Sequence, residues 1–218
     1  MQRLNCRNKG NVKLLKAAIF DVDGTVLDSM PMWATLGQNY LKSKGLNPSE
    51  DIDEKMLSFT VPQAAQYMKE QYKLALPAET IEAEVQQLTE DFYKNKVQIK
   101  DGIKDTLDFL QAKNIPMIVA SSSVKELIEG AFKRLDLMKY FKSIFIGSKS
   151  TPELFEQCLS YLKARPEEVL LFEDGMHSIV TAKKTGIKTV LIKDIQTNYE
   201  EIKKLSAFIF EDNEWKQF

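Results

Sequence analysis

The 218-residue sequence has only two cysteines, no long apolar run and no excess of charge of either sign. Its cysteines, Cys6 and Cys158, do not resemble a disulfide framework, so we expect free thiols in a reducing cytoplasm. No stretch approaches the roughly 18 apolar residues of a membrane-spanning helix, and no apolar segment typical of a secretory signal follows the early basic residues. The formal net charge of −1 indicates neither a nucleic-acid nor a membrane partner. We therefore expect a cytoplasmic protein with neither kind of partner.

The hydrophobic pattern changes twice along the chain. Basic residues precede any acid within residues 1–15, which we expect to form a solvated N-terminal tail. A single apolar strand follows, and residues 28–95 then place apolar side chains at helical spacing. Beyond this block, short apolar strands alternate with amphipathic helices, which is typical of a mainly parallel sheet covered on both faces. We therefore predict an α/β core of residues 16–27 and 96–218, with an all-helical insert of residues 28–95.

Several of the expected strands end in residues that carry chemistry. The strands are expected at residues 16–20, 116–120, 143–146, 169–172, 188–192 and 207–209. In such sheets, ligands gather at the carboxyl ends of the strands. Acids, hydroxyls and a cation follow four of these ends, in Asp21-Val22-Asp23, in Ser121-Ser122-Ser123, in the turn around Lys149, and in Glu173-Asp174-Gly175. We expect these four ends to form one catalytic site.

Asp21 and Asp23 directly follow the first expected strand and precede Gly24. Alternation places both carboxylates on the same side of the chain, where like charges raise one pKa or recruit a metal ion. Asp21 is the candidate nucleophile, because a carboxylate can attack phosphorus and form an aspartyl-phosphate. Asp23 is the candidate general acid toward the leaving oxygen and then the base toward water. Gly24 lets the backbone turn or approach a ligand closely. The alternative is that the two acids only stabilise a turn.

The other three strand ends supply the remaining candidates. Glu173 and Asp174 suit Mg²⁺, a hard cation held by carboxylates, waters and substrate phosphate, although a solvated acidic loop is the alternative. Ser121 and Ser122 precede a helix and could bind an anion, whereas a helix N-cap would use serine equally well. Lys149 could neutralise charge on the nucleophile and on the phosphate, or it could simply be solvated.

Together these residues resemble the motifs of the haloacid dehalogenase superfamily, in particular its phosphoglycolate phosphatase and β-phosphoglucomutase branch. The matching segments are Asp21 through Ser29 for D-x-D-G-T-x-x-D-S, Ser121, Lys149 through Glu153, and Glu173-Asp174. The resemblance implies a Rossmann-like core and Mg²⁺-dependent phosphoryl transfer through Asp21. It further implies that Asp23 binds the metal ion through its backbone carbonyl, and that Asp174 is the main downstream ligand, with Glu173 assisting. The helical insert would then be a mobile cap over the site.

Three departures from the family pattern bear on the reaction. The third motif lacks its first proline and has Glu153 in place of aspartate, and Ser178 stands where a glycine is frequent. In β-phosphoglucomutase-like enzymes the cap carries a histidine and an arginine that serves a second phosphate. The nearest positions in this chain are Trp33 and Val61. The missing histidine and arginine favour simple hydrolysis over a mutase that must hold a bisphosphate, whereas the retained Lys149 leaves catalysis expected despite a less rigid third motif.

The sequence therefore predicts a monomeric, Mg²⁺-dependent phosphatase that acts on a small phosphorylated metabolite. The alternatives are a β-phosphoglucomutase-like phosphomutase and a non-catalytic, phosphate-binding scaffold of the same superfamily. Gly24, Ser122 and Trp33 are the candidates for contact with the substrate, although Trp33 could instead belong to the core of the helical insert.

Overall fold

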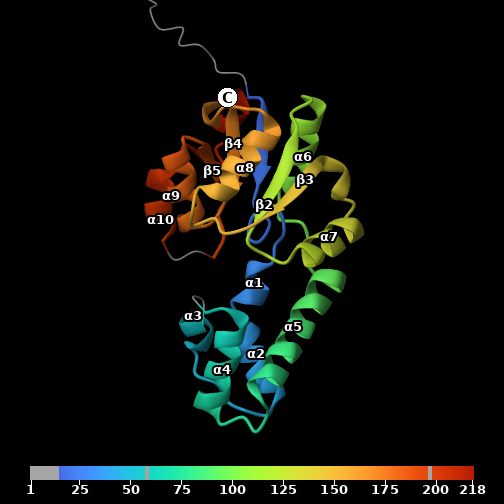
Figure 1. The fold of residues 1–218 in the computed structure, drawn as a ribbon, viewed down its shortest axis with the longest axis vertical. Helices are drawn as coiled ribbons and strands as arrows, with labels where there is room; N and C mark the ends of the chain where they lie inside the picture. The colour runs from blue at the N-terminus through green and yellow to red at the C-terminus, as the bar shows by residue number, and fades with distance from the viewer. Residues whose placement is uncertain (1–14, 57–58, 196–197) are drawn as a thin grey trace, which may run out of the picture.

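The computed structural model describes residues 15–56, 59–195 and 198–218. The predicted basic tail, apart from Leu15, and Cys6 lie outside these residues. Within them, no helix is long and apolar enough to cross a membrane. Figure 1 shows a sheet with flanking helices at one end of the molecule and a group of helices, α1 to α5, at the other.

All strand pairs of the six-stranded sheet are parallel, which confirms the predicted α/β class with a parallel sheet. The strands are β1 (Ala17–Phe20), β2 (Met117–Ser121), β3 (Phe141–Ile146), β4 (Val169–Glu173), β5 (Lys188–Leu191) and β6 (Phe208–Ile209). Their order in the sheet is β3-β2-β1-β4-β5-β6. This is the Rossmann order, in which the direction of winding reverses between β1 and β4 and leaves a crevice at their carboxyl ends.

The helices of this part cover both faces of the sheet. They are α6 (Ile103–Ala112), α7 (Lys125–Arg134), α8 (Glu153–Leu162), α9 (Met176–Thr185) and α10 (Tyr199–Leu205), with 3₁₀ turns at Met138–Tyr140, Pro166–Glu168 and Glu214–Gln217. Ala18 and Phe20 of β1 pack into the core beneath α6 and α7, whereas Ala17 and Ile19 pack against α8 and α9. Because both faces of β1 are buried, its sequence is a continuous apolar run.

The helical insert has a hydrophobic core of its own. Its helices are α1 (Met30–Trp33), α2 (Leu36–Ser43), α3 (Ile52–Met56), α4 (Val61–Tyr72) and α5 (Ala78–Asn95). Tyr40, Leu41, Ile52 and Ile81 are fully or almost fully buried in this second core. Helix α4 begins sharply, because Thr60 forms a capping box with Gln63 and a proline occupies the first turn.

The two connections between the insert and the sheet run side by side. The Asp28 N–H donates to the carbonyl of Gln98 over 3.0 Å, and the Lys100 N–H donates to the carbonyl of Val26 over 3.0 Å. Arg134 of α7 donates to the carbonyl of Val97 at the same place. Both connections are therefore held together at the carboxyl edge of the sheet, next to the crevice between β1 and β4.

Two boundaries differ from the predicted ones in informative ways. β3 begins at Phe141 rather than at residue 143, because Phe141 already pairs with Met117 of β2; its ring also stacks on Phe132 of α7 with 5.2 Å between ring centroids. β2 extends to Ser121, and the N-cap residue of α7 is Val124. Ser121 is therefore the last residue of a strand and not a helix cap.

Candidate active site

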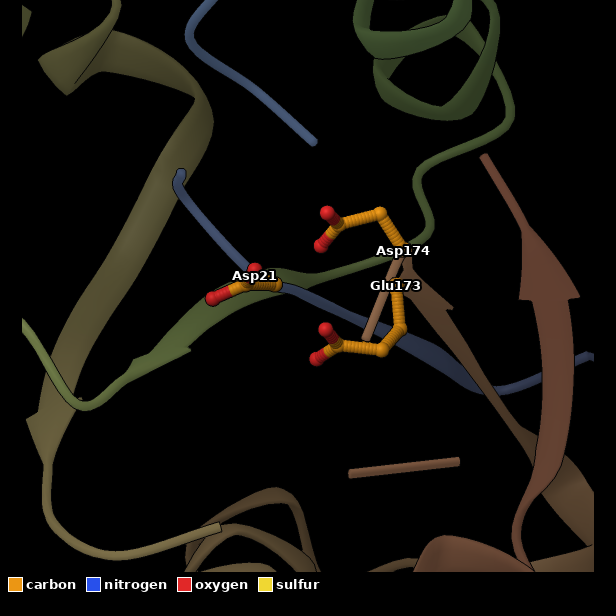
Figure 2. Close-up of side chains that lie close together, drawn as sticks. All are labelled: Asp21, Glu173 and Asp174. Carbon is orange, nitrogen blue, oxygen red and sulfur yellow. The ribbon is translucent and has the colours of Figure 1, made fainter. Parts of the chain in front are cut away.

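Three carboxylates meet where β1 and β4 end (Figure 2). Asp21 follows β1 directly, Glu173 is the last residue of β4, and Asp174 comes next in the chain. One oxygen from each carboxylate lies within 4.8 Å of the other two. Asp21 is 3% exposed and Glu173 is 1% exposed. Asp21 and Glu173 are 152 positions apart in the sequence, yet they belong to one acidic cluster at the topological switch point, because β1 and β4 are neighbours in the sheet.

Burial and mutual repulsion disfavour the ionised form of the carboxyl groups in this cluster. Burial, and next the charge of Glu173, raise the pKa of Asp21 to about 8, although Lys149 opposes the shift. Burial, followed by the charges of Glu173 and Asp21, also raises the pKa of Asp174 well above its usual value. Protonation or a bound cation therefore stabilises a folded protein that contains such a cluster.

Lys149 is the cation that the structure brings to the cluster. It lies in the turn after β3, and its Nζ is 2.6 Å from Oδ1 of Asp21 and 2.9 Å from Oε2 of Glu173. Burial alone would lower the pKa of Lys149, but the attraction of the two carboxylates outweighs burial and raises it above the usual value. The lysine therefore stays charged and fixes the orientation of Asp21.

Glu173 is held by a full set of donors. Its Oε1 accepts the Gly175 N–H over 2.9 Å, and its Oε2 accepts the Ser178 hydroxyl over 2.6 Å in addition to Lys149. Ser178 is one of the departures from the family pattern noted in the sequence, and in the structure its hydroxyl donates to Glu173 of the cluster. Sequence reasoning recorded Ser178 but assigned it no contact.

Asp23 lies beside the cluster and is held by hydroxyl groups. Its Oδ1 accepts the Ser29 hydroxyl over 2.7 Å and also accepts the Tyr93 hydroxyl. The Tyr93 oxygen in turn accepts the indole N–H of Trp33 over 3.1 Å. Burial, and next the charge of Asp23, raise the pKa of Tyr93 above its usual value, so the phenol keeps its proton. Sequence reasoning missed Tyr93, because nothing in the chain marks a tyrosine 70 residues downstream as a partner of Asp23.

One cavity of about 1230 Å³ joins the predicted site residues. The predicted residues that line it are Asp21, Asp23, Trp33, Ser121, Ser122, Lys149, Glu173 and Asp174. Ser121 is buried and its hydroxyl accepts the Ser123 N–H over 3.0 Å, whereas the Ser122 hydroxyl donates to the carbonyl of Gly147 over 2.9 Å. The four strand ends that the sequence singled out therefore face one cavity.

Gly24 does not line this cavity, but it packs closely against Asp174, which does. Its φ of +77° lies in the left-handed region, and a Cβ at this position would lie 2.5 Å from Oδ2 of Asp174. Only glycine allows the loop after β1 to approach the Asp174 carboxylate this closely.

Gly24→Ala is expected to destabilise the fold by about 1–3 kcal/mol and to displace Asp174, lowering kcat at least about tenfold. The matched control is Gly45→Ala, because Gly45 has φ +76° but nothing within 4 Å of the added Cβ. Urea unfolding and phosphate release measured on both variants separate the two effects. If both variants lost activity equally, the close approach to Asp174 would not matter for the site.

The donor set fits a hard divalent cation. Asp21, Glu173 and Asp174 offer three carboxylates within 4.8 Å of one another, and Lys149 forms ion pairs with Asp21 and Glu173. One lysine balances less charge than three ionised carboxylates carry. Oxygen ligands and uncompensated negative charge are what Mg²⁺ requires of a protein site. The described residues around this cluster can therefore hold such an ion.

The chain matches a known family model. The model for haloacid dehalogenase-like hydrolases covers residues 18–192, from β1 past β5. The chain belongs to this family. The match confirms the resemblance carried by the sequence motifs, and it includes every predicted site residue in the span of the model.

Individual relatives in the family are distant but match over most of their length. A phosphorylated carbohydrates phosphatase of Thermotoga maritima is 25% identical over 81% of this chain and 84% of its own. A phosphoglycolate phosphatase of Chromobacterium violaceum is 24% identical over 84% of this chain and 86% of its own.

Solved structures support the same fold. A Thermotoga maritima structure with the provisional name β-phosphoglucomutase superposes with a TM-score of 0.78 at 22% identity, covering 89% of this chain and 93% of that one. CbbY from Rhodobacter sphaeroides, in complex with phosphate, superposes with a TM-score of 0.72 at 18% identity, covering 91% and 94%. At these identities the likeness shows a shared fold.

Proposed function

We propose that this chain is a Mg²⁺-dependent phosphatase that hydrolyses a small phosphorylated metabolite through an aspartyl-phosphate on Asp21. The observation that carries the proposal is the convergence of Asp21, Lys149 and Asp174 at the switch point of the sheet, in one cavity with Asp23. The relatives named phosphatases support the same reaction class.

The reaction proceeds in two displacements at phosphorus. A carboxylate oxygen of Asp21 forms a bond to phosphorus while the bond from phosphorus to the leaving oxygen breaks, and Asp23 gives its proton to that oxygen. Water then transfers a proton to Asp23 and attacks the phosphorus of the aspartyl-phosphate. Inorganic phosphate leaves and the carboxylate of Asp21 is regenerated.

The surrounding residues hold the charges of both steps in place. Asp21, Asp174, the backbone carbonyl of Asp23 and, in an assisting role, Glu173 would hold Mg²⁺, which supplies positive charge that offsets repulsion between nucleophile and phosphate. Lys149 orients Asp21 by a direct ion pair. Ser121, Ser122 and the start of α7 lie on the cavity wall, where hydroxyl and N–H groups can bind phosphoryl oxygens.

Removing divalent metal is expected to lower phosphate release about a hundredfold, because the positive charge beside the transferring phosphoryl group is lost. Phosphate release from a panel of phosphate monoesters, measured in EDTA and after addition of excess Mg²⁺, checks this. Full activity in EDTA would contradict the assignment of the acidic cluster to a metal ion.

A phosphomutase is the second candidate, because the chain shares its fold with the structure provisionally named β-phosphoglucomutase. Trp33 and Val61 line the cavity at the positions compared with the mutase histidine and arginine, so they offer a second phosphate no charge. Isomerisation that depends on a bisphosphate activator, without release of phosphate, would favour the mutase. Binding of phosphate esters without either reaction would favour the non-catalytic scaffold.

Tyr93→Phe is expected to weaken catalysis by Asp23 selectively, because it removes one hydroxyl that fixes the acid. The value of kcat/KM should fall roughly tenfold or more for an alkyl phosphate, whose leaving oxygen needs the proton. It should change little for 2,4-dinitrophenyl phosphate, whose leaving group departs without protonation.

Tyr40→Phe is the matched control for this variant, since the Tyr40 hydroxyl also donates to a carboxylate, Glu84, within the helical insert. It should leave both values unchanged. An equal loss on both substrates in Tyr93→Phe would assign Tyr93 a purely structural role.

The helical insert takes the role of a cap in this proposal. Residues 28–95 would close over the cavity and exclude water during phosphoryl transfer, with residues 16–27 and 96–218 as the catalytic core. Both ends of the insert already contact Asp23, because the hydroxyl groups of Ser29 and Tyr93 donate to its carboxylate. We further propose that the enzyme is a cytoplasmic monomer.

A further inference from the structure

A second, smaller cavity of about 310 Å³ lies inside the helical insert. All five helices of the insert contribute side chains to it, from Met30 of α1 to Val85 of α5. Asp23, Met30, Trp33 and Val61 line both this cavity and the larger one that contains Asp21 and Lys149. Asp23 therefore stands at the junction of the two cavities.

The smaller cavity has an apolar lining. Its walls include Leu36, Met56, Phe59, Ala64, Met68 and Val85. Methionine side chains adapt to the shape of an apolar ligand, because they are flexible and polarizable. The volume is at the lower end of the range for small-molecule pockets, and such pockets are mostly apolar with a few polar groups at their edge.

The polar groups of this cavity already have partners within the protein. The carboxylate of Asp53 accepts the Gly37 N–H over 2.7 Å and the Gln38 N–H over 3.3 Å. The indole N–H of Trp33 donates to Tyr93. No Lys, Arg or His side chain lines this cavity among the residues that the structure describes. A second phosphate or a carboxylate placed here would be an unpaired buried charge, which is strongly unfavourable.

The larger cavity differs in charge. Lys94, Arg134 and Lys149 line it together with the acidic cluster. Among the described residues, basic side chains therefore line the cavity that contains Asp21 and not the smaller cavity on the other side of Asp23.

We infer that the apolar cavity holds the leaving group of the substrate, which is therefore a monophosphate ester of an uncharged, largely apolar alcohol. The inference rests on the proposed function. A general acid must contact the oxygen that joins the phosphoryl group to the leaving group. With the phosphoryl group beside Asp21, the group on the far side of that oxygen points toward the cavity behind Asp23.

The first arm of the test is a substrate series on the unmodified protein. The value of kcat/KM for n-alkyl phosphates from ethyl to hexyl should rise roughly fourfold with each methylene, as apolar surface enters the cavity. Phosphoglycolate, whose leaving group carries a carboxylate, should be a poorer substrate than butyl phosphate.

The second arm reduces the size of the cavity. Ala64→Leu places added bulk in the lining and should lower the ratio of kcat/KM for hexyl phosphate to that for ethyl phosphate about tenfold. The matched control is Ala83→Leu, because Ala83 is an exposed residue of α5 that lines neither cavity. The control should keep the ratio of the unmodified protein.

The outcomes separate this inference from the proposed function. Phosphate release that does not depend on chain length, or a preference for phosphoglycolate over butyl phosphate, would overturn the leaving-group assignment and leave the phosphatase intact. An unchanged ratio in a folded Ala64→Leu variant would also overturn it. Absence of phosphate release from every ester, with Mg²⁺ present, would overturn the proposed function and this assignment with it.

Discussion

Asp21→Asn is expected to abolish phosphate release, with kcat lowered by at least about 10⁴-fold, while the protein remains folded. A carboxamide has nearly the shape of the carboxylate but does not attack phosphorus. The substitution also replaces a buried carboxyl group, whose pKa is raised to about 8, with an amide that cannot ionise, so repulsion within the acidic cluster decreases. The loss of activity should therefore appear without unfolding.

The control for this variant is Asp136→Asn. Asp136 is an exposed residue that forms a surface ion pair with Lys139, and asparagine accepts its left-handed backbone conformation. Activity measured with Mg²⁺ and circular dichroism on both variants test the expectation. Substantial turnover by a folded Asp21→Asn protein would rule out Asp21 as the nucleophile.

Lys149→Met is expected to affect both activity and stability. It removes the cation that contacts Asp21 and Glu173, so kcat should fall about 10²- to 10³-fold. The free energy of unfolding should fall by about 3 kcal/mol, because buried carboxylates lose their partner. Lys133→Met is the control, since Lys133 is largely exposed and its Nζ lies at the long distance of 3.8 Å from Oε2 of Glu129.

The stability loss of Lys149→Met should depend on pH in a defined direction. In metal-free protein the pKa of Asp21 is raised, so ionisation of this group opposes folding as the pH rises through about 8. Without the lysine this opposition increases. Urea unfolding in EDTA should therefore show a larger difference from the unmodified protein at pH 9 than at pH 5. A difference that is the same at both values would contradict the role of Lys149 in balancing the cluster.

The sequence was sufficient to predict the sheet and the proximity of most candidate site residues, because both depend on strand ends. β1 and β4 are short apolar runs buried on both faces, and such runs are recognisable without a structure. Once the strands are taken as parallel, their carboxyl ends must share one edge. Asp21, Ser121, Lys149 and Asp174 then fall into one cavity, as the structure shows.

The contacts made by the helical insert could not be predicted in this way. Tyr93 reaches Asp23 only because α5 returns to the sheet beside the first connection, and helical spacing does not reveal that path. The apolar cavity between the helices depends equally on how α1 to α5 pack. Ser178 was recorded as a departure, but its bond to Glu173 required the position of α9 relative to β4. These features arise from tertiary packing rather than from local pattern.

The measurement that tests the account most directly is chemical trapping of the phosphorylated residue during turnover. The protein is mixed with Mg²⁺ and a substrate that releases phosphate, quenched, reduced with borohydride and digested for mass spectrometry. Reduction of an aspartyl-phosphate converts the aspartate to homoserine. The account predicts homoserine at position 21, dependent on substrate and on Mg²⁺, and absent when Asp21→Asn is used. Phosphate release with an unmodified Asp21, or with homoserine at another position, would contradict it.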